Sequence, residues 1–426
     1  MRSLKLQLKL NIQTVIYVQI FFVFVMLWLR DALHFPSAIS YITDLLLLLT
    51  LFLSFISGSG FRIYKKAFVQ YGIVSLIVLF VLIGVVLNFV DPLLVLWGFR
   101  NNFRFYLFFF LCVSLLDGSD IDRLLKMFKG FFWANLLLCT YQYFVLGYER
   151  DYLGGFFGTT QGCNGYLNVF LCIICAVLIS DFFSSKAGIG KLTLYLVASL
   201  YIAIIAELKV FYIELILMLI FVVIMNRPSL KMFLITAVVL TGFAVAVYIL
   251  FRYDPRSFMF LFDADALEYY IAGNGYTNSG DLNRFTAISQ ITEMFFKDDP
   301  LRILFGYGLG NCDYSQYSFL QSDFYHLHGD LNYRWFTHAW VYLEQGAVGL
   351  ILLVTFFVSI FLYAARRLNS TYRSYMIFAV VFVPTCILGL MYNSAVQIEL
   401  SYIIAFACAI PYIVSKTTPV GELQKQ

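Results

Sequence analysis

The stretch FTHAWVYLEQGAVGLILLVTFFVSIFLYA, residues 336–364, is apolar over a length that can cross a lipid bilayer as one helix. Similar runs recur along all 426 residues, of which 61% are hydrophobic and 13% charged. Soluble domains carry about 25% charged residues, so this chain has too few polar side chains to cover a globule in water. The sequence therefore predicts an all-α polytopic membrane protein.

We predict about twelve transmembrane helices, and the charges between them predict the topology. Most of the 29 Lys and Arg fall in alternate loops, which also include the N-terminal segment and the C-terminal tail. Basic loops stay in the cytoplasm, so both termini are predicted to be cytoplasmic. For residues 192–225, one broken segment is the alternative to two short spans. The predicted spans are 12–29, 39–56, 68–90, 100–116, 124–147, 166–183, 192–207, 209–225, 231–251, 337–364, 375–391 and 398–415.

These spans divide the chain into three parts: helices one to nine in 1–251, a large non-cytoplasmic loop in 252–336, and helices ten to twelve with a cytoplasmic tail in 337–426. The loop segment 281–296, DLNRFTAISQITEMFF, has helical periodicity. We expect an amphipathic helix that lies on the membrane or caps the bundle, with Asp281 or Asn283 as its N-cap. The glycines of FGYGLGN (305–311) predict a tight turn where the backbone passes close to a neighbour.

Cationic residues collect at the predicted outer ends of the spans, where they suit a phosphate or pyrophosphate head group. Structural explanations remain open. Arg100 and Arg104, one helical turn apart, can instead snorkel to lipid head groups. Lys209 can form an ion pair with Glu207, and Arg284, in the first turn of the predicted loop helix, can be solvated. The outer set comprises Arg100, Arg104, Arg150, Lys209 and Arg284.

His338 begins the predicted span 337–364, at a dielectric boundary close to this cationic set. A neutral histidine there is well placed as a general base, and the alternative is a histidine that is hydrogen-bonded at the interface. Tyr342, Gln345 and Gly349 follow on its helix face, while Glu344 points away. Gly346 and Gly349 allow a neighbouring helix to approach closely.

We expect no metal ion and no other cofactor. His326 and His328 with Asp330 lie too close together in sequence to predict a metal site by themselves. The acidic stretch DADALE (263–268), in an outer loop, is better explained as a solvated turn. Cys163 and Cys312 both fall on the outer side, so a disulfide between them is an open alternative.

The segment NRFTAISQITEMFFKDDPLRILFGYGLGN (283–311), followed by HAWVYLEQGAVGLILLV (338–354), resembles the signature of the O-antigen polymerase / O-antigen ligase superfamily, the Wzy- and WaaL-type proteins. GFFGTTQGCNGYLNVFL (155–171) is similar to the glycine–asparagine start of a middle span in that family. Two positions depart from the pattern. Lys209 stands where many members have arginine, and Ala339 stands where ligases often have Asn or Ser, which favours a polymerase.

The resemblance implies a GT-C-like bundle that transfers a glycan from undecaprenyl pyrophosphate on the periplasmic face of the bacterial inner membrane. Arg284 and Lys209 would bind the pyrophosphate, and His338 would activate or position the acceptor hydroxyl. A polymerase would use a second lipid-linked repeat unit as acceptor and can have a chain-length regulator protein as partner; no nucleic-acid partner is expected. The alternatives are an O-antigen ligase or O-oligosaccharyltransferase, and a lipid-linked oligosaccharide flippase.

Overall fold

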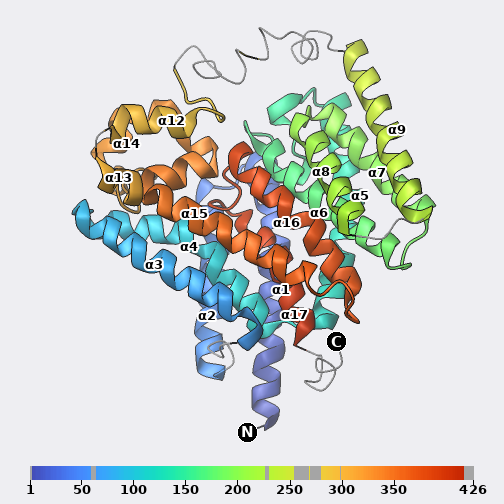
Figure 1. Ribbon diagram of the computed structural model, residues 1–426, viewed down its shortest axis with the longest axis horizontal. Coiled ribbons are helices and arrows are strands. Elements are labelled where there is room, and N and C mark those ends of the chain that lie inside the picture. Colours follow the sequence, from blue (N-terminus) through green and yellow to red (C-terminus); the bar gives the residue numbers. More distant parts are fainter. Residues whose placement is uncertain are drawn as a thin grey trace.

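In the computed structural model, which describes residues 2–58, 64–225, 230–253, 268, 280–297 and 299–416, every regular element is a helix (Figure 1). The first nine helices are α1 (Arg2–Leu33), α2 (Tyr41–Ser57), α3 (Phe68–Leu87), α4 (Pro92–Leu115), α5 (Gly118–Phe144), α6 (Cys163–Phe183), α7 (Ile189–Ile205), α8 (Lys209–Met225) and α9 (Leu230–Tyr253). The last three are α15 (Thr337–Ala365), α16 (Arg373–Tyr392) and α17 (Ser401–Ser415).

Each predicted span overlaps one of these long helices. By length and composition, six helical segments of the described chain can cross a membrane: Ile12–Leu33, Ser37–Ser57, Lys65–Leu87, Cys163–Phe183, Thr337–Ala365 and Arg373–Tyr392. Ile189–Ile205, Leu230–Val245 and Ser401–Ser415 are apolar but shorter. A polytopic helical membrane protein is therefore confirmed as the class, and twelve spans remain a prediction.

Contacts at the two ends of the bundle follow the alternation predicted from the charges. At one end, Lys66 Nζ donates to the Ser415 carbonyl and Lys416 Nζ donates to the Leu116 carbonyl. At the other end, Asp31 at the end of α1 accepts a 2.7 Å hydrogen bond from the backbone N–H of Thr159. Residues predicted to share a side of the membrane thus lie at the same end of the molecule.

The outer lobe, residues 280–297 and 299–336, lies against the first half of α15 (Figure 1). It contains α12 (Ala287–Ile291), α13 (Pro300–Phe305) and α14 (Asp323–His328). Ile291 and Phe296 are buried in a small core with Tyr342 and Leu343 of α15. The lobe therefore caps the bundle, which is one of the two arrangements that the sequence predicted. Apart from Glu268, the DADALE stretch lies outside the described residues.

The loop helix is shorter than predicted. Asn283 Oδ1 accepts from the Phe285 N–H at 3.0 Å, so the side chain stabilises a turn, and α12 begins only at Ala287. Arg284 consequently precedes the helix instead of lying in its first turn. A π-helical turn, Thr292–Phe296, then follows α12. Its extra residue per turn helps to bring Phe296 into the core, and the neighbouring Phe295 packs partly buried against the same core.

α4 begins eight residues before the predicted span 100–116. Asp91 caps it by accepting from the Leu93 N–H at 2.7 Å, and Pro92 occupies the first turn, where its missing N–H costs nothing. Arg100 and Arg104 therefore lie inside a helix and not at its first residues, and the end of the span stays a prediction. The polar run RNNFR looked like a boundary, but its side chains are used in contacts within the bundle.

The two-span interpretation of residues 192–225 is confirmed as two helices. α7 ends at Ile205 and α8 starts at Lys209. Glu207 between them has φ of 50°, in the left-handed region, which interrupts the helix between α7 and α8.

Candidate functional site

Arg284 and His338 meet where the outer lobe joins the start of α15. Nε2 of His338 lies 2.9 Å from the carbonyl oxygen of Arg284, although 54 residues separate them. The Arg284 guanidinium lies 4.5 Å from the ring centroid of Tyr392 and 5.2 Å from that of Phe336. We call these four residues the Arg284 junction. It brings together the cation and the imidazole that the sequence singled out.

Two helix ends hold this junction in place. The backbone N–H and the hydroxyl of Thr337 both donate to the Asn393 carbonyl, at 3.0 and 2.9 Å. Nδ1 of His338 lies 3.1 Å from the carbonyl oxygen of Leu390 in the last turn of α16. The first N–H groups and last carbonyls of helices lack partners within their own helix, and here the two sets satisfy each other. The start of α15 is thereby fixed against the end of α16.

The hydrogen bonds of His338 bear on its chemical role. Its side chain is buried, and both ring nitrogens face carbonyl oxygens. A neutral imidazole has one N–H donor and one lone pair. A general base needs that lone pair directed at the substrate, whereas here each nitrogen is directed at the protein backbone. The geometry therefore favours a structural role, in which His338 ties the Arg284 segment to α16, and the predicted role at the acceptor hydroxyl stays a prediction.

The glycine-rich turn of the outer lobe packs directly on α4. Gly306, Gly308 and Gly310 have φ values of 68°, 87° and 83°. A Cβ on Gly310 would lie 1.9 Å from the Leu94 carbonyl oxygen, and a Cβ on Gly98 would lie 2.4 Å from the Gly310 nitrogen. The predicted tight turn with close backbone approach is confirmed. No side chain fits between the two backbones, so the contact fixes the position of the lobe on α4.

Glu344 of α15 holds the same turn from the other side. Its Oε1 accepts from the backbone N–H groups of Gly310, at 3.1 Å, and Cys312, at 3.4 Å. Its Oε2 accepts from Asn102 Nδ2 of α4 at 3.1 Å. The prediction that Glu344 points away from His338 is confirmed. α15 is also kinked at Gly346, whose φ is 64°, and a Cβ there would lie 2.3 Å from the Leu304 carbonyl carbon.

Arg100 and Arg104 belong to a charge cluster in which Arg104 is buried and the other charged members are partly buried. Arg100 Nη2 lies 2.6 Å from Asp44 of α2, and Arg104 Nη1 lies 3.2 Å from Glu399. Contacts of 3.7 Å also join Arg100 to Glu399 and Arg104 to Asp44. Tyr402 donates to Asp44 at 2.7 Å. Two cations thus face two carboxylates, and the Arg104 side chain is only 3% exposed. Snorkelling does not describe these arginines, because they point into the bundle.

Neither Asp44 nor Glu399 was among the site residues predicted from the sequence. Both carboxylates lie near the predicted outer ends of their spans, as the two arginines do. The sequence places these two carboxylates and the two arginines at the same predicted end of the bundle. That placement could have predicted the cluster, because a charge inside a membrane protein needs a partner.

A third arginine extends this cluster into the outer lobe. Arg334 Nε lies 3.3 Å from Asp313, and the Asn101 amide donates to the other oxygen of the same carboxylate. Burial raises the pKa of Asp313, and the charge of Arg334 opposes that effect. The Arg334 guanidinium also lies 4.4 Å from the ring centroid of Trp340. These residues were missed because only the folded lobe brings them together.

The two remaining candidate cations lie near the start of α8. Arg150 Nε lies 3.0 Å from Glu207 Oε1, and the Arg150 side chain is 63% exposed. Lys209 is exposed and is the first residue of α8. The sequence proposed Lys209 as the partner of Glu207, and the structure shows Arg150 in contact with that carboxylate. Both cations lie on the side of the bundle predicted to be outer.

The protein contains no disulfide bond, since all eight cysteines are free. Cys163 Sγ lies 3.3 Å from the Asp151 carbonyl oxygen, and Cys312 is buried under Glu344. The disulfide considered between them is not formed. Within the described part of the chain, no three His, Cys, Asp or Glu side chains lie close enough together to hold a metal ion.

No protein-family model matches this sequence, and none of the curated proteins compared with it matches. The resemblance to the polymerase and ligase superfamily therefore rests on the quoted motifs themselves.

Proposed function

We propose that this protein polymerises oligosaccharide repeat units that are linked to undecaprenyl pyrophosphate. The observation that carries the proposal is the Arg284 junction. The resemblance assigns Arg284 to the lipid-pyrophosphate donor and His338 to the acceptor hydroxyl. Those two residues are in contact across 54 positions of sequence.

The chemistry requires stabilisation of a leaving group. The acceptor hydroxyl oxygen attacks the anomeric carbon, the bond from that carbon to the pyrophosphate breaks, and its electrons stay on the pyrophosphate. A fixed guanidinium stabilises the charge that develops there. The Arg284 guanidinium carbon lies over the rings of Phe336 and Tyr392, and guanidinium N–H groups are the donors that bind phosphate oxygens.

The other residues take supporting roles in this proposal. His338 positions Arg284 by binding its carbonyl, and Lys209 and Arg150 attract the anionic head group at the outer end of α8. Arg100 and Arg104 are assigned to the architecture instead, because Asp44 and Glu399 neutralise them. That assignment departs from the substrate-binding role predicted from the sequence.

The proposed setting is the bacterial inner membrane, with both termini cytoplasmic and the junction periplasmic. The donor and acceptor are both lipid-linked repeat units, so they reach the junction from the bilayer. A chain-length regulator is the protein partner that such a polymerase would have.

The test is an assay with the purified full-length protein in liposomes and lipid-pyrophosphate repeat units. A ladder of products on a gel supports the polymerase. A single unit transferred to lipid A–core would instead identify a ligase, and repeat units moved across the bilayer without a glycan product would identify a flippase. His338→Ala and Arg284→Ala should each remove the ladder while the protein remains inserted. Wild-type ladders from both variants would contradict the site assignment.

A further inference from the structure

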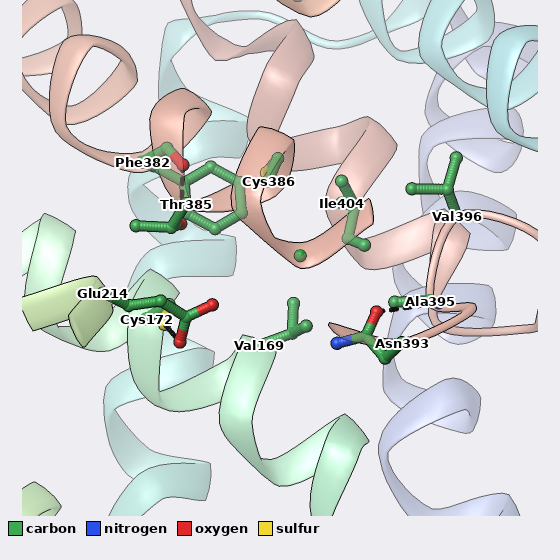
Figure 2. A pocket seen from close by; sticks show the side chains of 11 residues that line it. Val169, Cys172, Glu214, Phe382, Thr385, Cys386, Asn393, Ala395, Val396 and Ile404 are labelled. Carbon is green, nitrogen blue, oxygen red and sulfur yellow. Dashed lines mark hydrogen bonds between the residues drawn. The ribbon is translucent and has the colours of Figure 1, made fainter. Parts of the chain in front are cut away.

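A second polar site lies behind the Arg284 junction, in a cavity between α6, α8, α16 and α17 (Figure 2). Its lining includes Val169, Glu214, Cys386, Asn393 and Val396. Asn393 is also the residue whose carbonyl accepts both hydrogen bonds from Thr337. The cavity and the junction therefore share the end of α16.

Glu214 supplies the acceptor in this cavity. The residue is only 2% exposed, and no ion pair of Glu214 occurs among the described residues. Its Oε2 accepts from Asn168 Nδ2 at 2.8 Å and from Cys172 Sγ at 3.0 Å. Figure 2 shows the other oxygen, Oε1, directed into the cavity. In the described part of the chain Oε1 has no hydrogen-bond partner, and a buried carboxylate oxygen without a donor is costly.

Asn393 supplies a donor from the opposite side. Its Oδ1 accepts from the Ala395 N–H at 3.0 Å, which fixes the orientation of the amide. Figure 2 shows Nδ2 directed into the cavity, and no acceptor for Nδ2 is found among the described residues. The walls between the two polar groups are largely apolar, with Val169, Val396 and Ile404 among them.

A group that fits between an acceptor and a donor must itself donate and accept. A hydroxyl does both with one oxygen, whereas an ammonium cannot accept and a carboxylate cannot donate. We propose that this cavity binds one hydroxyl group, which donates to Glu214 Oε1 and accepts from Asn393 Nδ2, and that Glu214 takes up its proton during glycosyl transfer. This inference rests on the proposed function. It also supplies the base that His338, with both nitrogens on carbonyls, does not.

The proton and the electrons balance in this step. The hydroxyl O–H bond breaks and the proton moves to Glu214 Oε1, while the oxygen bonds to the anomeric carbon of the donor. The bond between that carbon and the pyrophosphate breaks, and its electron pair leaves with the pyrophosphate. The hydroxyl is either that of the acceptor sugar or that of a water molecule. In the second case the acceptor hydroxyl oxygen forms the bond to the anomeric carbon, its proton moves to the water, and the water gives one proton to Glu214 Oε1.

Infrared difference spectroscopy on the resting full-length protein tests the binding without any glycan product. Glu214→Gln identifies the carboxyl band of Glu214, which should shift when H2O is replaced by D2O or when lipid-linked repeat units are added. A shift that requires the repeat unit assigns the hydroxyl to the acceptor sugar. Because Asn168 and Cys172 also donate exchangeable protons to Glu214, a shift in D2O assigns the hydroxyl to water only if Gly389→Ala, whose methyl group is added to the cavity lining, reduces that shift. A Glu214 band that responds to neither would overturn the inference, even if polymer is formed.

Turnover tests the proton transfer. Glu214→Gln keeps the size of the side chain but removes the base, so polymer formation should fall at least about 100-fold. Gly389→Ala is the second variant, because Gly389 lines the cavity and a Cβ there meets no heavy atom within 4 Å. It should fold at least as stably as the wild type and still lose turnover, because the methyl group occupies the space of the hydroxyl.

Gly130→Ala in α5 is the matched control, since a Cβ there also meets nothing within 4 Å and lies outside the cavity. It should leave turnover unchanged. Wild-type turnover in both Glu214→Gln and Gly389→Ala would overturn the inference while leaving the polymerase proposal intact. A wild-type protein without polymerase activity but with the expected infrared shifts would instead separate the hydroxyl site from the proposed function.

Discussion

The arginines of the Arg284 junction and of the charge cluster differ in what surrounds them. Arg100 and Arg104 contact the carboxylates of Asp44 and Glu399, and Arg104 is almost completely buried. The described contacts of the Arg284 guanidinium are with the aromatic faces of Phe336 and Tyr392, and the residue is half-buried. A carboxylate neutralises an arginine, whereas an aromatic face attracts and orients the cation.

This difference separates an architectural cation from a ligand-binding one in a membrane protein. Position in the sequence does not make the distinction, since both groups were predicted at outer span ends. The side chains that contact each arginine make it. Arg284 lies at a half-buried junction in contact with two rings, whereas Arg104 is buried against two carboxylates.

Arg104→Ala should give the largest effect. It leaves Glu399 and Asp44 with only the partly buried Arg100 between them, and the loss of a buried charge partner destabilises a protein by about 3–5 kcal/mol. The free energy of unfolding in detergent micelles measures this. A loss under about 1 kcal/mol would mean that the cluster is well solvated and that the comparison fails.

Arg284→Ala should act on turnover instead of stability. Removing a group that stabilises transition-state charge lowers the rate by about 100- to 1,000-fold, while loss of the ring contacts costs only about 1 kcal/mol of unfolding free energy. Arg302→Ala is the matched control, because Arg302 lies 4.8 Å from the ring centroid of Tyr307 in the same lobe. Equal loss of turnover in both variants would show that any ring-held arginine of the lobe matters.

Gly310→Ala tests the link between the two regions. The added Cβ would clash with the Leu94 carbonyl, so the outer lobe should shift off α4 at a cost of about 1–3 kcal/mol. Limited proteolysis of the lobe and unfolding in detergent report this shift. Gly280→Ala has a similar φ of 82° but open space around the Cβ, so it measures backbone strain alone. Equal effects of the two variants would exclude the close contact as the cause.

Arg150→Ala should give the smallest change in stability. Its ion pair with Glu207 involves a side chain that is 63% exposed, and exposed pairs contribute about 0.2–1 kcal/mol. The difference from the wild type should shrink further at high salt, because salt screens exposed charges. A loss as large as that of Arg104→Ala would contradict the division into buried and exposed cations.

The sequence predicted the helical membrane class, the approximate helix positions and the tight glycine turn, because these depend on local composition and backbone requirements. It also predicted Arg284 and His338 as a pair, although only through a resemblance. It placed the start of α4 wrongly, since polar side chains satisfied inside a bundle look like a loop boundary. The contacts of Asp313 with Arg334 and of Glu344 with the glycine turn were missed, because they join residues that are distant along the chain.

The glycine contacts also determine the order in which α3, α4 and the outer lobe can pack during synthesis. Asn88 and Gly306 are joined by a 3.0 Å hydrogen bond across 218 residues, so the surface around Gly84 and Gly98 leaves the ribosome long before the turn that covers it. During synthesis the surface of α3 and α4 around Gly84 and Gly98 therefore stays uncovered until the lobe has been made and packs on it. In a chain truncated before residue 306 this surface of α3 and α4 would stay uncovered. Quality-control proteases recognise such exposed packing surfaces, so we expect the truncated chain to be degraded.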